Sequence, residues 1–289
     1  MNFDAFLETA WSDHGDRPQE VADRLASSLH VVEAPEHIPP FARLLTHVYG
    51  EHLGQWSRGI DLLEAMRALP GFDGSEVAEG VLSRNIATLR YAGGDAAALT
   101  SLDVADRAFV LASAAAAFAG RGEHMRGVAA YSEALRLANS GLPPGSAAVR
   151  ALAIGGNNLA TALEEKKDRD AAETEGMLVA AQGGLTYWKQ AGTWLEEERA
   201  EYRLTRSQLQ ARRAKDAIES ARRCVDVCER NDAPAIETFF GYVVLALAQR
   251  ADGDATAFAA SRQRALALLE QVPEDEKRYC QSDLADLGN

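Results

Sequence analysis

The sequence predicts an all-α protein, a right-handed superhelical solenoid of about five to six helix-turn-helix pairs with capping helices at both ends. Apolar residues recur at helical spacing along most of the 289 residues, whereas alternating strand patterns are nearly absent. Short turns recur about every 40 residues, a period typical of helical repeats. Alanine supplies 54 residues, which favours helices that pack closely through small side chains.

Two kinds of break divide the chain. Tight turns within helix pairs are expected near residues 52, 94, 121, 166, 213 and 253. Longer Pro/Gly segments at 70–74 and 141–145 separate one pair from the next, because both residues end helices. The short step from the turn near 94 to the next predicts that the helix at 75–92 has an abbreviated partner at about 95–102.

The repeats are expected to fill residues 36–271. Residues 1–35 are predicted to form N-terminal capping helices at about 3–11 and 17–31. A C-terminal capping segment, 272–289, is predicted to contain a helix at about 274–287. An open-ended stack with incomplete caps can dimerise through a terminal helix, so a homodimer is one expected assembly.

The segment 107–139 resembles a tetratricopeptide repeat. The large and small residues at that family's packing positions are Leu111, Ala114, Ala115, Phe118, Gly122, Gly127, Tyr131 and Ala134. Segments 42–70 and 242–265 match more loosely, and 156–180 and 201–225 keep the period but depart from the residue pattern. The resemblance implies a concave groove that is lined by the first helix of each pair and binds a peptide.

Asparagines on first helices often bind the peptide backbone in that family, and Asn85 and Asn158 lie at or near the corresponding position. An amide offers a donor and an acceptor to one peptide unit. The alternative is that each Asn contacts only water or a neighbouring repeat.

Charge is unevenly distributed along the chain. The net charge of −13 argues against general nucleic-acid binding. One basic segment, 199–230, places Arg199, Arg203 and Arg206 on one helix face, where they could hold an acidic peptide or a C-terminal carboxylate. The alternative is an ordinary solvated surface, on which the arginines pair with nearby carboxylates at Glu196, Glu197, Glu198 and Glu201.

Large aromatic residues gather beside these arginines, at Tyr187, Trp188, Trp194 and Tyr202. They are expected either to fill a wide repeat interface or to line the groove, with Tyr202 among the candidate ligand contacts. Aromatic rings are favoured at binding hot spots because they bury much area for few rotatable bonds.

The segment His47-Val48-Tyr49-Gly50-Glu51-His52 raises the alternative of a metal-dependent enzyme. His47 and Glu51 are four residues apart, but the spacing matches neither HExxH nor HxxEH. A third ligand from His14, His30 or His37 would be needed, and the sequence spacing selects none of them. We therefore expect no metal, no cofactor and no catalytic site.

The function expected from the sequence is a non-catalytic scaffold that binds a protein or peptide in the solenoid groove. A second hypothesis is a regulatory protein whose solenoid closes on a small signalling peptide. No membrane-spanning stretch or signal peptide is recognised, and Cys224, Cys228 and Cys280 do not form a disulfide or zinc pattern. We therefore expect a cytoplasmic protein with reduced cysteines and no membrane partner.

Overall fold

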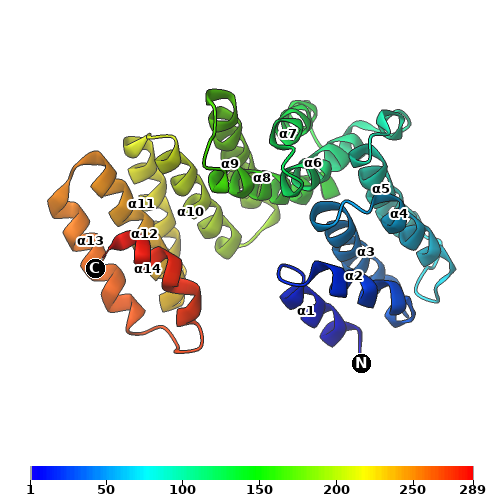
Figure 1. The fold of residues 1–289 in the computed structure, drawn as a ribbon, viewed down its shortest axis with the longest axis horizontal. Coiled ribbons are helices and arrows are strands. Elements are labelled where there is room, and N and C mark those ends of the chain that lie inside the picture. The colour runs from blue at the N-terminus through cyan, green and yellow to red at the C-terminus, as the bar shows by residue number, and fades with distance from the viewer. Residues whose placement is uncertain (1, 289) are drawn as a thin grey trace. The chain divides into compact units, whose positions relative to one another are not determined.

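The computed structural model describes residues 2–288, and over that range it contains fourteen α-helices and no strand (Figure 1). The chain divides into two compact units, Met1–Gly155 and Gly156–Asn289. The boundary falls inside helix α8, Ala147–Glu165. It also falls within residues 36–271, the range over which a single repeat domain is expected.

Seven helices lie wholly in the first unit. They are α1 (Phe3–Asp13), α2 (Pro18–Ser27), α3 (Ile38–Thr46), α4 (Trp56–Ala65), α5 (Glu76–Ala92), α6 (Val104–Gly120) and α7 (His124–Ala138). Short 3₁₀ turns cover Leu29–Val31, Pro35–His37, Met66–Ala68 and Ala96–Leu99, and a π-helix covers His47–His52.

Local sequence explains where several of these helices begin. Asn2, Ser75 and Asp103 each accept a hydrogen bond from a backbone N–H in the first turn of α1, α5 and α6, respectively. Such caps satisfy donors that have no partner within the helix. The apolar faces of α1 to α5 then pack into one continuous core that includes Phe6, Phe41 and Leu89.

Six further helices lie wholly in the second unit. They are α9 (Ala171–Ala191), α10 (Trp194–Gln210), α11 (Ala214–Arg230), α12 (Ala235–Asp252), α13 (Ala255–Leu269) and α14 (Gln281–Leu287), with a 3₁₀ turn at Lys277–Cys280. Capping boxes start α9 and α10, and Gly253 in the left-handed conformation ends α12.

Consecutive helices pack in antiparallel-like pairs, α6 with α7, α8 with α9, α10 with α11, and α12 with α13. The prediction of an all-helical protein of packed helix pairs is therefore confirmed. The abbreviated partner at 95–102 is the 3₁₀ turn Ala96–Leu99, and the expected C-terminal helix at 274–287 is a 3₁₀ turn followed by the short α14. Among the described residues, no helix is both long and apolar enough to cross a membrane.

Candidate functional site

Helix α10 carries the three arginines of the predicted stripe and contacts the helices on either side of it. It packs against α9, α11 and α12 in the second unit. A capping box at Thr193 and Glu196 fixes its start, since the Thr193 backbone N–H donates to Glu196 Oε2 at 2.8 Å. The polar side chains of α10 are consequently held in a fixed register against its neighbours.

Arg199 forms a two-point ion pair with Glu237 of α12. Its Nη2 lies 2.5 Å from Glu237 Oε1, and its Nε lies 3.3 Å from Glu237 Oε2. The hydrogen bond to Glu237 raises the pKa of Arg199, against the opposing effect of burial. Its side chain is 62% exposed, so this guanidinium remains accessible to solvent while it is paired.

The other two arginines of the predicted stripe are less accessible. Arg203 pairs with Glu164 of α8, whose other carboxylate oxygen accepts a 2.6 Å hydrogen bond from Ser207. Arg206 lies 2.7 Å from Asp286 of α14. Both arginine side chains are about a quarter exposed, so internal pairing dominates their surroundings.

Tyr202 also contacts the C-terminal helix. Its hydroxyl donates a 2.5 Å hydrogen bond to Asp283 Oδ1, and its ring meets Phe240 edge-on at 6.0 Å. Burial and the nearby Asp283 carboxylate raise the pKa of Tyr202, so the phenol keeps its proton. The aromatic residues predicted beside it are buried at Tyr187 and half-buried at Trp188 and Trp194.

Two glutamates of α10 are buried beneath this polar surface. Glu201 is fully buried and accepts hydrogen bonds from Lys189 at 3.1 Å and Arg223 at 3.0 Å. Glu198 is 1% exposed, and burial raises its pKa to about 8. Cys224, whose own pKa burial raises, donates to Glu198 from 3.1 Å. The glutamates beside the arginine stripe therefore do not all form a solvated surface.

The two predicted peptide-contact asparagines lie in different units. Asn85 on α5 is 7% exposed and donates from Nδ2 to the Val81 carbonyl at 2.8 Å, within its own helix. Asn158 on α8 is half-buried. The hydrogen bond of Asn85 lies within α5, whereas the alternative to peptide contact placed the amide against water or a neighbouring repeat.

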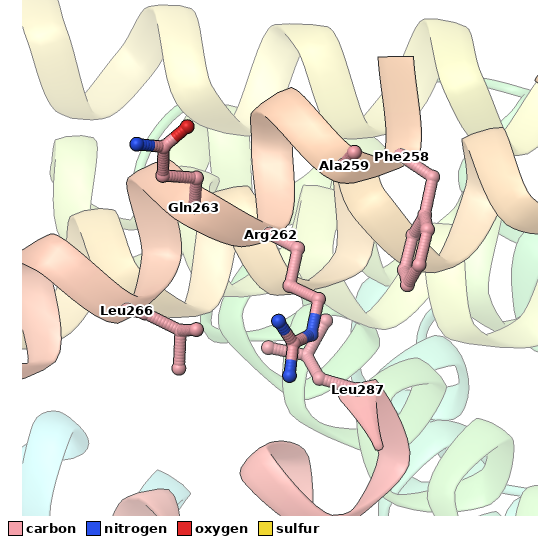
Figure 2. Close-up of a pocket in the computed structure, with 6 residues that line it drawn as sticks. All are labelled: Phe258, Ala259, Arg262, Gln263, Leu266 and Leu287. Atoms are coloured by element: carbon pink, nitrogen blue, oxygen red, sulfur yellow. The ribbon is translucent and has the colours of Figure 1, made fainter. Parts of the chain in front are cut away.

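Among the hollows in the described part of the second unit, two are lined by its helices. One, of about 580 Å³, is lined by charged side chains of α9, α10 and α11 that include Lys189, Arg223 and Arg230. The other, of about 380 Å³, lies between α13 and Leu287, and Figure 2 shows Arg262 extending towards Leu287. Arg262 also donates to the Gly288 carbonyl at 2.9 Å, which ties α13 to the chain after α14.

Three histidines come together in the first unit, and the sequence spacing alone does not reveal their grouping. Ligand nitrogens of His14, His47 and His52 all lie within 4.8 Å of one another, and each residue is half-buried. Glu51 joins the group, because His47 Nδ1 lies 2.7 Å from Glu51 Oε2. Burial lowers the pKa of His14 and His52, which favours their neutral forms.

The other two histidines considered as a third ligand lie in different surroundings. His37 stacks on Phe3 with a ring separation of 3.9 Å, and His30 is exposed. A signal for the actual grouping does exist in the sequence, namely a glycine on either side of Glu51-His52-Leu53, which loosens the helix there. It does not indicate which distant histidine joins.

The π-helix is the local feature that brings His47 and His52 together. In a regular α-helix, side chains five residues apart point in widely different directions. A π-helix forms its backbone hydrogen bonds between residues i and i+5, so side chains five apart lie one above the other. The Leu53 N–H accordingly donates to the Val48 carbonyl at 3.1 Å. Tyr49 anchors this turn to α2, because its hydroxyl donates to the Ala22 carbonyl at 2.8 Å.

The described chain is an all-helical protein of packed helix pairs. Its polar side chains gather on helix α10 and in the histidine cluster. No protein-family model matches the sequence, and no curated protein matches it significantly.

Proposed function

We propose that this protein is a non-catalytic binding scaffold, a tetratricopeptide-like right-handed solenoid that holds an acidic peptide segment of a partner protein. Repeated helix pairs with short turns support the solenoid assignment. Stacked pairs of this kind form extended binding surfaces, so contacts that are individually weak add up over several repeats.

The single observation that carries the proposal is the state of Arg199. The Arg199 side chain is 62% exposed, although its guanidinium is paired with Glu237 at two points. A ligand carboxylate can therefore reach this guanidinium from the solvent, and no buried arginine has to move. Arginine suits this task because its planar group binds carboxylates with two parallel hydrogen bonds.

Arg203 and Arg206 play a supporting part in this proposal. Their internal pairs with Glu164 and Asp286 hold α10 in place and keep positive charge along the same helix face. Asp286 is itself 43% exposed, so a ligand carboxylate can compete with it for Arg206. We therefore propose that carboxylates of a partner replace internal carboxylates as the ion-pair partners of these arginines.

The test uses labelled peptides and the full chain. Fluorescence anisotropy would compare an acidic peptide carrying a free C-terminal carboxylate, the same peptide amidated, and a basic peptide of equal length. We expect the acidic peptide to bind and Arg199→Ala to weaken it by about tenfold, the value of a hydrogen bond to a charged group. Arg136→Ala is the matched control, since Arg136 is similarly exposed and paired only with Glu133 in its own helix.

Equal loss of affinity in Arg199→Ala and Arg136→Ala would mean that acidic peptides are attracted only by the electrostatic field of the whole protein and not by a specific site. Equal binding of acidic and basic peptides would rule out carboxylate recognition by α10. Either result would overturn the proposal.

A further inference from the structure

We propose that His14, His47 and His52 form a binding site for one divalent transition-metal ion of the zinc type, with Glu51 holding His47 in the ligating orientation. This site lies in the first unit and is independent of the proposed peptide groove. Three features of the cluster support the site: the hydrogen bonds that occupy some ring nitrogens, the distances between the remaining nitrogens, and the access of solvent to the group.

The hydrogen bond of His14 leaves one nitrogen for a metal. His14 Nδ1 lies 2.5 Å from the Trp11 carbonyl oxygen, and a carbonyl only accepts. Nδ1 therefore carries the proton, so in the neutral ring the lone pair is on Nε2. Because His14 directly follows α1, this short contact with the last turn of the helix fixes the ring.

Glu51 imposes the same arrangement on His47. The Glu51 carboxylate accepts a 2.7 Å hydrogen bond from His47 Nδ1, so the lone pair of the neutral His47 ring is on Nε2. A carboxylate on the far nitrogen of a ligating histidine is the usual supporting contact in metal sites, where it orients the ring and makes it a stronger ligand. Here the π-helix supplies the carboxylate and two of the histidines from six consecutive residues.

The spacing of the free nitrogens suits a small metal ion. His47 Nε2 and His52 Nε2 are 3.1 Å apart. Zinc–nitrogen bonds of about 2.0–2.1 Å in tetrahedral geometry place neighbouring ligand atoms about 3.3 Å apart. One ring nitrogen from each of the three histidines lies within 4.8 Å of those of the other two, so closing the set to bonding distances requires only small shifts of these half-buried residues.

The metal-free contact between His47 and His52 is compatible with this site. His52 Nε2 can donate its proton to the His47 lone pair across 3.1 Å. When His52 carries its proton on Nδ1 instead, both Nε2 lone pairs face the same point. Three imidazoles with no thiolate ligand favour zinc, copper, nickel or cobalt over magnesium and calcium, which prefer oxygen ligands.

The surroundings leave one coordination position available. The three histidines are half-buried, so water can occupy the fourth position of a tetrahedral ion. The other aromatic neighbour is Trp11, whose ring lies 5.1 Å from that of His14 and 5.4 Å from that of His47. Bound Cu²⁺ or Co²⁺ should therefore quench the fluorescence of Trp11.

The experiment titrates chelator-treated full-length protein with Zn²⁺, and separately with Co²⁺, by calorimetry and visible absorption. We expect one equivalent to bind, with the visible spectrum of a tetrahedral Co²⁺ complex and no competition from excess Mg²⁺. His47→Ala and His52→Ala should each weaken binding at least a hundredfold, and Glu51→Gln about ten- to a hundredfold. His30→Ala, which removes an exposed histidine from the same unit, should leave the affinity unchanged.

Nuclear magnetic resonance of the unaltered protein tests the site without any substitution, so the result does not depend on whether a variant folds. Zn²⁺ should shift the ring signals of His14, His47 and His52 and leave those of His30, His37 and His124 in place. Unchanged signals from the cluster would overturn the proposal, as would equal Zn²⁺ affinity in His30→Ala and folded His52→Ala. Quenching by Cu²⁺ that is undiminished in Trp11→Phe would also count against it.

Discussion

Tyr202 of α10 donates a 2.5 Å hydrogen bond to Asp283 of α14, and this contact ties the C-terminal helix to the centre of the second unit. The two residues are distant in sequence. Asp283 is buried, and Arg206, which is half-buried like Tyr202, lies 3.7 Å from it. Burial raises the pKa of Asp283, so its carboxylate depends on these partners for compensation. The end of the chain is thus held by polar contacts as well as by its apolar face.

Tyr202→Phe should destabilise the protein by about 1–3 kcal/mol, because it leaves a buried carboxylate oxygen short of a donor. Urea unfolding followed by circular dichroism measures the change. Tyr242→Phe is the matched control, since its hydroxyl bonds Glu229 at an exposed position, and it should change stability little. Equal effects of the two substitutions would contradict the structural role of Tyr202.

Stability should fall with rising pH through Glu198. Burial raises its pKa from 4.5 to about 8 in the folded protein, so the folded state binds more protons than the unfolded state between these values. The contribution of Glu198 is therefore fully present below about pH 4.5 and is lost as the pH rises through about 8.

Glu198→Gln removes this titration while keeping an acceptor for Cys224. The loss of stability between pH 6 and pH 8 should be smaller in the variant than in the unaltered protein, by about 1–2 kcal/mol. Urea unfolding at the two pH values measures it. Parallel pH dependences for the two proteins would show that Glu198 is ionised in the folded state throughout.

Gly155→Ala should destabilise the first unit, although alanine is the better helix former. A Cβ at this position would lie 2.4 Å from the backbone oxygen of Ala112 on α6, so the two helices would have to separate. We expect a loss of about 1–3 kcal/mol. Gly80→Ala in α5 meets only the flexible end of Arg84 and should stabilise by up to about 1 kcal/mol. The same sign for both substitutions in thermal unfolding would contradict close packing of α6 and α8.

Arg203→Ala should destabilise the second unit by about 3–5 kcal/mol, because it removes the partner of a carboxylate whose side chain is only 9% exposed. Burial already raises the pKa of Glu164, which makes the partner important. Arg136→Ala, at an exposed pair, should cost no more than about 0.5 kcal/mol. Chemical denaturation of both variants measures the difference, and a small effect at Arg203 would mean that water replaces the arginine.

The three arginines of α10 have different partners, and this difference decides which substitution can test the proposed binding. From the sequence, Arg199, Arg203 and Arg206 look equivalent, since they share one helix face. In the structure, charge reversal at Arg203 would set two carboxylates together inside the fold, and loss of binding could then reflect loss of folding. Removal of Arg199 also leaves a carboxylate that is only 10% exposed, that of Glu237, so circular dichroism must show that Arg199→Ala is folded before its affinity is compared.

Helix boundaries follow closely from the sequence because they depend on local chemistry. The helix expected at 75–92 is α5, Glu76–Ala92, which Ser75 caps and a Gly-Gly pair ends. Helix α12, Ala235–Asp252, ends at the tight turn expected near residue 253. Caps, breaks and the spacing of apolar residues act over a few positions, so the chain encodes them directly.

The sequence by itself determined an all-helical chain, its turns and its helix pairs, because backbone hydrogen bonds within a helix are local. Only the tertiary structure decided that Arg203 pairs with Glu164 and that His14 joins His47 and His52. Those partners come from distant segments, and packing of the helix faces selects them. The π-helix at His47–His52 likewise packs against α2 and α6, so the histidine cluster could not be read from spacing alone.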